Sequence, residues 1–184
     1  QASNFNQPLD NWDVSNVKYM GLMFSMASSF NQPLATWNVG SVTNMDLMFQ
    51  DASSFNQPID NWNVGNVTSM FWMFFKASNF NQPLNEWDVS KVRDMSNMFY
   101  YASNFDQPLN KWNLKSLEHQ TSPPSGSYDF SFGYTAMSCE NYSLTLSAWA
   151  GNPDVPVDIV MDATALTYAT NASAARDHLI NDLG

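Results

Sequence analysis

The stretch that decides the fold is ASSFNQPIDNWNVGNVTSMFWMFFK, which runs from Ala52 to Lys76. Nearly the same 25 residues begin at Ala2, Ala27, Ala52 and Ala77, and a fifth copy begins at Ala102 and fades after residue 117. A fixed period of about 20 to 50 residues is typical of solenoid proteins, in which each repeat buries its apolar side against its neighbours. The period therefore predicts one elongated array of five repeats over residues 1–118.

The spacing of apolar residues within a copy predicts its local structure. Leu9, Trp12 and Val14 follow the L-x-x-L-x-L template of a leucine-rich-repeat strand, and alternation places Trp12 and Val14 on the inner side. Farther along, Met20 and Met23 stand three residues apart, which suits one or two helical turns. We therefore predict an α/β solenoid, namely a leucine-rich-repeat-like right-handed parallel β-solenoid with short helical turns, whose strands lie at each Trp-Asp/Asn-Val.

One polar column recurs beside the apolar ones. It comprises Asn6, Asn31, Asn56, Asn81 and Asp106, with a Gln next to each. One hypothesis is an amide ladder that satisfies backbone groups from repeat to repeat. The alternative is a row that binds a ligand. A polar residue kept beside constant apolar residues favours the ladder.

The motif FNQPLDNWDVSNVxxMxxMF resembles the BspA-like leucine-rich repeats of bacterial surface proteins, whose 25-residue form is typical of Mycoplasma surface lipoproteins. The resemblance covers residues 2–118. The chain departs from the usual consensus because Val17 and its equivalents stand where that consensus has Asn or Cys. The resemblance implies a secreted or cell-surface location, a role in binding or adhesion, and no catalytic residues.

Composition excludes several partners. The chain has 184 residues and a net charge of −10, with only 7 Lys and Arg. An acidic surface repels the phosphate backbone, so we expect no nucleic-acid partner, and there is no basic patch or long apolar run for a membrane. We also expect a monomer. The single cysteine, Cys139, excludes an internal disulfide, and we expect it to be a small buried residue.

The residues after the array differ in composition. Residues 119–127 read as a linker, and residues 128–184 as a capping segment that covers the open end of the array. Within it we predict a helix over 138–149, a strand over 156–161 that adds to the fifth repeat, and a last helix that begins near Asn171. The array and its cap would form an elongated molecule.

Two surfaces are candidates for binding. The first is a polar ribbon on the outer side of the predicted strands, made of Asn11, Asp13, Asn38, Asn61, Asn63, Glu86 and Asp88. The second is an aromatic patch in columns that hold Ser, Asp, Gln or Lys in other copies, made of Phe71, Trp72, Phe75, Tyr100 and Tyr101. The alternative for the patch is that its rings only pack on one another or under the C-terminal segment.

The sequence contains no arrangement typical of an enzyme. His119 and His178 are the only histidines, and neither stands in a catalytic or metal-binding motif. Calcium is the one cofactor considered, at Asp10 and Asp13 or at Glu86 and Asp88, with a solvated acidic face as the alternative.

Three functions follow from these expectations. The first is an extracellular or cell-surface module that binds a protein or a glycan in adhesion. The second is a structural spacer within a longer adhesin, and the third is an ice-binding solenoid. The column Lys18, Thr43, Thr68, Arg93 and Glu118 is too varied for a flat threonine array, which disfavours the third function.

Overall fold

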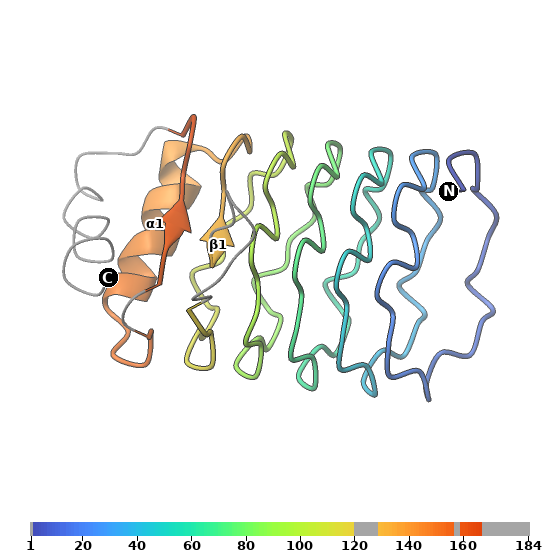
Figure 1. Ribbon diagram of the computed structural model, residues 1–184, viewed down its shortest axis with the longest axis horizontal. Helices are drawn as coiled ribbons and strands as arrows, with labels where there is room; N and C mark the ends of the chain where they lie inside the picture. Colours follow the sequence, from blue (N-terminus) through green and yellow to red (C-terminus); the bar gives the residue numbers. More distant parts are fainter. Residues whose placement is uncertain (1, 120–128, 157–158, 167–184) are drawn as a thin grey trace.

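The repeats form successive coils that lie side by side along the long axis of the molecule (Figure 1). A computed structural model of the chain describes residues 2–119, 129–156 and 159–166. Its regular elements all follow the repeats: β1 Phe130–Ser131, α1 Cys139–Ala150 and β2 Met161–Asp162. The strands β1 and β2 pair in parallel, with Phe130 opposite Met161. These elements lie at the end of the row of coils that is farthest from the N-terminus (Figure 1).

The predicted fold class is wrong. The described repeats contain neither the strand expected at each Trp-Asp/Asn-Val nor the helical turn expected around Met20 and Met23. In place of a strand, the Trp segment closes tight turns: the N–H of Trp62 donates to the carbonyl of Ile59 and that of Val67 donates to Val64. The α/β, leucine-rich-repeat-like β-solenoid is therefore not the architecture of this chain.

Backbone hydrogen bonds join the coils at a different segment, for which the second repeat is the example. Alternate N–H groups of residues 45–51 donate to the next copy, at Met45 to Ser69, Leu47 to Phe71, Phe49 to Met73 and Asp51 to Phe75, over 2.8–3.0 Å. Of the intervening N–H groups, those of Met48 and Gln50 donate to carbonyls three residues earlier, and that of Asp46 donates to the side-chain oxygen of Asn44. We call this segment, and its equivalents in the other copies, the turn ladder. Only isolated parallel bridges, such as the one between Asn44 and Ser69, mark its edge as sheet-like.

Left-handed residues explain why the turn ladder is not a helix. Each of the first four copies places two non-glycine residues at positive φ, namely Leu22 and Met26, Leu47 and Asp51, Trp72 and Lys76, and Asn97 and Tyr101. An α-helix needs an unbroken run of right-handed residues. The spacing of three between apolar residues thus arises from repeated tight turns and not from a helical period.

The inward columns form one continuous core. The Met and Val columns are buried from the second copy to the fourth, and the columns of Phe30 and Ala27 are buried from the second copy to the fifth. Phe49 of the second copy stacks on Phe55 of the third at 4.0 Å between ring centroids, and Phe55 meets Phe80 of the fourth copy at 6.0 Å. The indole N–H of Trp62 donates to the carbonyl of Leu34, 28 residues earlier, at 3.0 Å. Trp37, Trp87 and Trp112 repeat this bond.

The amide ladder is confirmed. The backbone N–H groups of Asn31, Asn56, Asn81 and Asp106 each donate to the side-chain oxygen of the Asn one copy earlier, at 2.9 Å. A Gln side chain from the same copy donates to the same oxygen, as Gln57 does to Asn31 at 3.0 Å. Each Asn is therefore committed to its neighbouring coil.

The C-terminal elements partly match the prediction. The helix expected over 138–149 is confirmed as α1, with Ser138 as its N-cap. The strand expected over 156–161 beside the fifth repeat is wrong in position, because β2 pairs with β1. The segment around β1 meets the repeats instead, where the N–H of Tyr101 donates to the carbonyl of Gly133 at 2.9 Å. Most of the predicted linker and the predicted last helix lie outside the described residues.

We expect Trp62→Ala to lower the free energy of unfolding by about 3–5 kcal/mol, as large-to-small changes in a core do. Trp62 is 3% exposed, stacks on Trp87 and donates to a buried carbonyl. Thermal and urea unfolding would measure the loss. Asn61→Ala, at the exposed neighbour, is the control. Equal midpoints for the two variants would show that the Trp column is not part of the core.

We expect Gly133→Ala to destabilise the junction between the repeats and the C-terminal elements. A Cβ atom at Gly133 would lie 2.1 Å from the carboxylate of Asp162 and 2.7 Å from the ring of Tyr100. Overpacking of this kind costs about 1–3 kcal/mol or more, and unfolding by urea would report it. Gly151→Ala is the matched control, because its nearest neighbour would lie at 3.4 Å. A wild-type midpoint for Gly133→Ala would contradict the close packing of this junction.

Candidate functional site

The aromatic patch lies on the turn ladder of the third and fourth copies, and its rings touch one another. Phe71 contacts Trp72 at 5.2 Å between centroids, Trp72 contacts Phe75 at 4.3 Å, and Phe75 contacts Tyr100 of the next copy at 6.0 Å. Tyr100 then meets Tyr101 edge-on at 4.7 Å. The structure thus brings together all five aromatic residues that the sequence singled out.

A sixth ring, Tyr134, extends the patch beyond the repeats. It stacks on Tyr101 at 4.4 Å with the two planes 1° apart, and it meets Tyr100 edge-on at 5.6 Å. We call the six residues together the aromatic ribbon. Tyr134 was missed in the sequence because it lies outside the copies that could be compared. Its positive φ matches that of Tyr101, one coil earlier.

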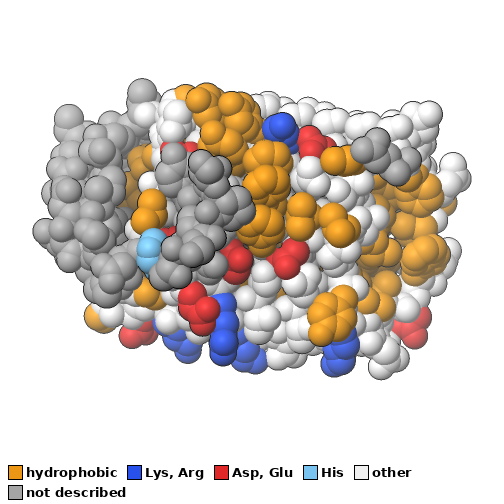
Figure 2. All heavy atoms as spheres, viewed as in Figure 1, with side chains coloured by type: hydrophobic (Ala, Val, Ile, Leu, Met, Phe, Trp, Pro, Cys, Tyr) orange, Lys and Arg blue, Asp and Glu red, His pale blue; other side chains and the backbone are white. Residues whose placement is uncertain are grey.

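The aromatic ribbon is partly open to solvent. Tyr101 and Tyr134 are 40% and 38% exposed, and the other four rings are half-buried. The rings therefore pack on one another and still remain partly at the surface. Hydrophobic side chains gather on one face of the molecule, over the central coils and toward its N-terminal end (Figure 2).

The turn ladder carries further apolar side chains that sequence reasoning overlooked. Leu22 is 60% exposed and Leu47 half-buried, and both stand in the column of Trp72. The residues of this column lie side by side in successive coils. The N–H of Leu22 donates to the carbonyl of Asp46, and the N–H of Leu47 donates to the carbonyl of Phe71. The sequence held a signal for them. Leucine recurs at 22 and 47, in a column that the predicted helical turns would place on the outer surface.

The polar ribbon is exposed but is largely engaged in local turns. The side chains of Asp13, Asn38, Asn63 and Asp88 each accept the N–H two residues farther on, at 3.0–3.2 Å. The side chain of Asn61 donates to the carbonyl of Ala35 at 2.8 Å. These are turn-forming bonds that Asn and Asp make in many proteins. Asn11 and Glu86 are exposed beside them.

Hydrogen bonds lower the pKa of two carboxylates of this ribbon. The side chain and then the backbone N–H of Ser15 lower the pKa of Asp13. Hydrogen bonds from Ser90 lower the pKa of Asp88, and Lys115 and Lys91 add a smaller electrostatic effect. The carboxylates therefore stay ionised as acceptors for their own turns.

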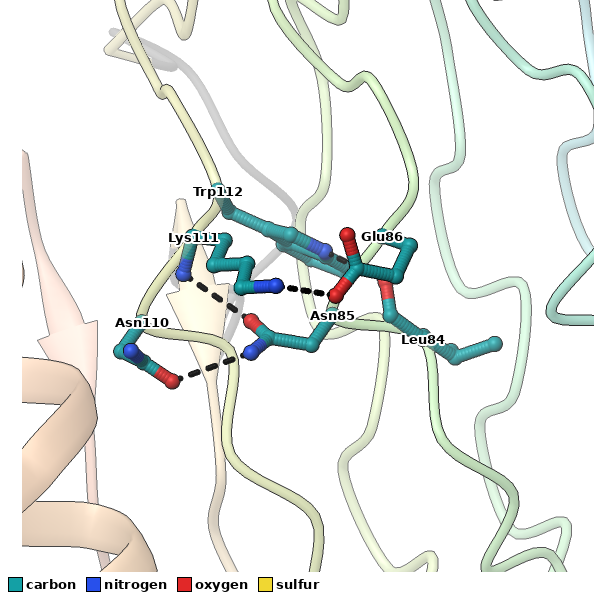
Figure 3. Close-up of polar contacts among 6 residues, drawn as sticks. All are labelled: Leu84, Asn85, Glu86, Asn110, Lys111 and Trp112. Carbon is teal, nitrogen blue, oxygen red and sulfur yellow. Dashed lines mark hydrogen bonds and ion pairs between the residues drawn. The ribbon is translucent and has the colours of Figure 1, made fainter.

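The acidic pairs proposed for calcium lie in the same polar surroundings. Glu86 forms an ion pair with Lys111, and Lys111 also donates its backbone N–H to Asn85 at 2.9 Å (Figure 3). The same view shows Asn85 donating to Asn110 and Trp112 donating to the carbonyl of Leu84. Across residues 2–119, 129–156 and 159–166, no three His, Cys, Asp or Glu residues are grouped as metal ligands.

The titratable groups near the C-terminal elements have structural partners. His119 lies 2.8 Å from Asp129 between Nδ1 and Oδ2, and Asp129 also accepts the N–H of Val160. Asp162 is buried and accepts from Ser131 at 2.9 Å. Cys139 is exposed at the start of α1, so the expectation of a buried thiol is wrong. In the part of the chain that is described, no helix has the length and apolarity to cross a bilayer.

A family model matches residues 1–71 and again residues 36–132, and its description is Mycoplasma protein of unknown function, DUF285. The chain belongs to this family. The expected relation to a Mycoplasma repeat family is confirmed at this level, while the narrower relation to BspA-like repeats is not shown. Comparisons with curated proteins and with solved structures find no match.

In this DUF285 chain, the C-terminal end of the amide ladder differs from the rest. Asp106 replaces Asn, and its Oδ1 accepts the N–H of Ser138 at 2.7 Å and the side-chain amide of Asn141 at 2.9 Å. Burial alone would raise the pKa of Asp106, but the hydrogen bonds from Ser138 and Asn141 outweigh it and lower the pKa. A carboxylate also suits the N-terminus of α1, where the helix dipole is positive.

We expect Asp106→Asn to remove an acid-sensitive part of the stability. Because the folded state lowers the pKa of Asp106, its contribution is present above the unfolded pKa of about 4 and is lost as the pH falls through the folded pKa. The stability difference between wild type and Asp106→Asn should therefore shrink between about pH 5 and pH 2. Thermal unfolding across this range measures it, with Asp60→Asn at an exposed position as the control. A difference that does not vary with pH would contradict the role of the carboxylate.

Proposed function

We propose that this chain is a non-enzymatic extracellular or cell-surface repeat module that binds a protein or glycan in adhesion. The observation that carries the proposal is the aromatic ribbon, in which six rings stay at the surface of a polar, acidic chain. Tyr and Trp are enriched among residues that dominate binding energy. The proposal assigns the binding role to this ribbon and a lesser one to the polar ribbon.

The variation between copies supports the proposal. Position 71 holds Phe where the neighbouring copies hold Asp46 and Ser96, and position 75 holds Phe where the second copy holds Gln50. The same backbone thus accepts a polar residue at each place. The rings are not needed for the fold of a copy, which favours a role at the surface.

The rigid setting of the ribbon also favours binding. Its residues are held by the turn ladder, whose backbone N–H groups donate to the next coil on both sides of the third copy. A binding surface on a preorganised scaffold loses less conformational entropy than one on a free loop. The polar ribbon is less suited, because the turns already use most of its acceptors.

The second candidate is a structural spacer within a longer adhesin. The observation that favours it is the uniform bonding from coil to coil, which would transmit length and stiffness along an array. We also propose that the FNQP motif reflects kinship with BspA-like surface proteins, although the copies lack the strand of a leucine-rich repeat. Both ideas are compatible with a location outside the cell.

We expect an array of glycans and surface proteins, screened with and without calcium, to give a ligand that depends on the aromatic ribbon. The double variant Phe75→Gln and Tyr101→Asp installs the residues of the second copy and should weaken binding at least about tenfold, or about 1.4 kcal/mol. Asn61→Thr, which installs the residue of Thr36 in the polar ribbon, is the matched control. Binding lost in the control and kept in the double variant would move the site to the polar ribbon. Absence of any ligand would favour the spacer.

A further inference from the structure

Apart from Trp12, which is exposed in the first copy, the indole groups of the chain divide into two kinds. Trp37, Trp62, Trp87 and Trp112 donate their N–H to a carbonyl one coil earlier, and Trp149 of α1 does the same to Leu109 at 3.2 Å. Trp72 differs, because its Nε1 is buried and has no hydrogen-bond partner among the described residues. A buried donor without a partner destabilises the folded state, because it loses the hydrogen bond that it makes to water in the unfolded chain. Its presence calls for an explanation beyond packing.

The fold does not require an indole at this position. The same column holds Leu22 and Leu47 in the first two copies and Asn97 in the fourth, on the same backbone. Trp72 also has φ 54°, a left-handed conformation that is unfavourable for a bulky side chain. The residue thus adds an unsatisfied N–H where leucine would add none. Such local costs are found at binding and catalytic sites.

The surroundings of Trp72 indicate the chemistry of its ligand. Two carboxylates near the ribbon are already engaged, since Asp46 accepts the N–H of Phe71 at 3.0 Å and Asp51 accepts from Gln50. Lys76 lies 5.2 Å from the ring centroid of Phe75 and forms no ion pair with the described residues. The indole N–H and the ammonium group are both donors. Their complement is an acceptor with negative charge.

The packing of the rings favours a protein over a sugar. Trp72 is stacked between Phe71 and Phe75, with interplanar angles of 19° and 10°. Sugars bind by stacking on open aromatic faces, and the faces of Trp72 are already covered. Apolar side chains pack against ring edges as well as faces, and ring edges carry a partial positive charge. An apolar peptide that also carries a carboxylate matches both features.

We propose that Trp72 is the anchor of a protein-binding site for an apolar segment that carries an Asp or Glu. On binding, the indole shifts within the ring stack, with both faces still covered, and its N–H edge donates to the carboxylate, while Lys76 pairs with the same group. The bond removes the cost of the unpartnered N–H and supplies specificity for an acidic segment. This inference rests on the proposed function and narrows its ligand to a protein.

The first test measures the stability of Trp72 variants. A residue needed for packing loses stability when it is replaced, whereas a residue needed for binding does not. Trp72→Leu installs the residue of Leu47, and Trp72→Phe keeps a ring without the N–H. We expect both variants to keep or raise the thermal midpoint. Trp62→Phe, which loses a hydrogen bond to Leu34, should lower it. A loss in the Trp72 variants as large as that in Trp62→Phe would overturn the proposal.

Binding is tested with a random peptide library displayed on phage, selected on the whole chain and counter-selected on Trp72→Leu. We expect enriched peptides that place Asp or Glu among apolar residues. A synthetic copy should bind Trp72→Phe and Lys76→Met at least about tenfold more weakly, and its amide counterpart should bind the wild type more weakly by a similar factor. Fluorescence anisotropy measures each affinity.

The alternative results are distinct. Peptides that bind Trp72→Leu as well as the wild type would overturn the anchor. No peptide, together with a glycan that depends on Phe75 and Tyr101, would overturn the anchor and leave the proposed function standing. No peptide, no glycan and no surface protein bound by the chain would overturn both.

Discussion

The structure depends on hydrogen bonds that each coil makes to the next. The described repeats contain no helix or strand, and tight turns satisfy only part of the backbone donors within a copy, which leaves the other backbone donors and the indole N–H groups without a partner there. They donate to the adjacent copy instead, through the turn ladder, the Trp column and the amide ladder. Because a buried donor must have a partner, each copy is stable only beside another of the same design. Among the constant residues of the repeat, the Trp and Asn columns take part in these bonds through their side chains.

The C-terminal elements meet the same demand with a different backbone. Ser138 and Asn141 donate to Asp106 as the next Asn and Gln would, and Trp149 donates to Leu109 as the next Trp would. Residues around β1 continue the turn ladder through Gly133. The segment around β1 thus takes the place of the turn ladder of the fifth copy, and α1 with its N-cap supplies donors that a sixth copy would supply. The end of the stack is closed by matching its hydrogen bonds as well as by covering its apolar surface.

Comparison of the copies predicted the parts of the structure that depend on contacts between equivalent residues of neighbouring copies. The Trp, Phe and Met columns are buried and the Asn column is a ladder, because equivalent residues in stacked copies meet one another. The local conformation was not predictable in the same way. Leu47, Trp72 and Lys76 adopt the left-handed conformation although their types disfavour it. The N–H of each donates to the next coil, and the carbonyl of the residue before each accepts from the previous coil, so the two peptide groups are held in place. Spacing alone therefore suggested helical turns and strands that do not form.

The candidate site was predictable for a related reason. Columns that point inward are constrained by their neighbours in two coils, whereas outward columns are free to change, as at Gly21, Asp46 and Phe71. When a surface residue differs in chemical type from the equivalent residues of the other copies, folding does not explain the difference, and a function can. Leu22 and Leu47 escaped this test because leucine is ordinary in an apolar repeat, and Tyr134 escaped because it belongs to no copy. The indole of Trp72 shows the departure most clearly, since its neighbours in the column prove that the fold accepts leucine, while its buried N–H has no partner among the described residues.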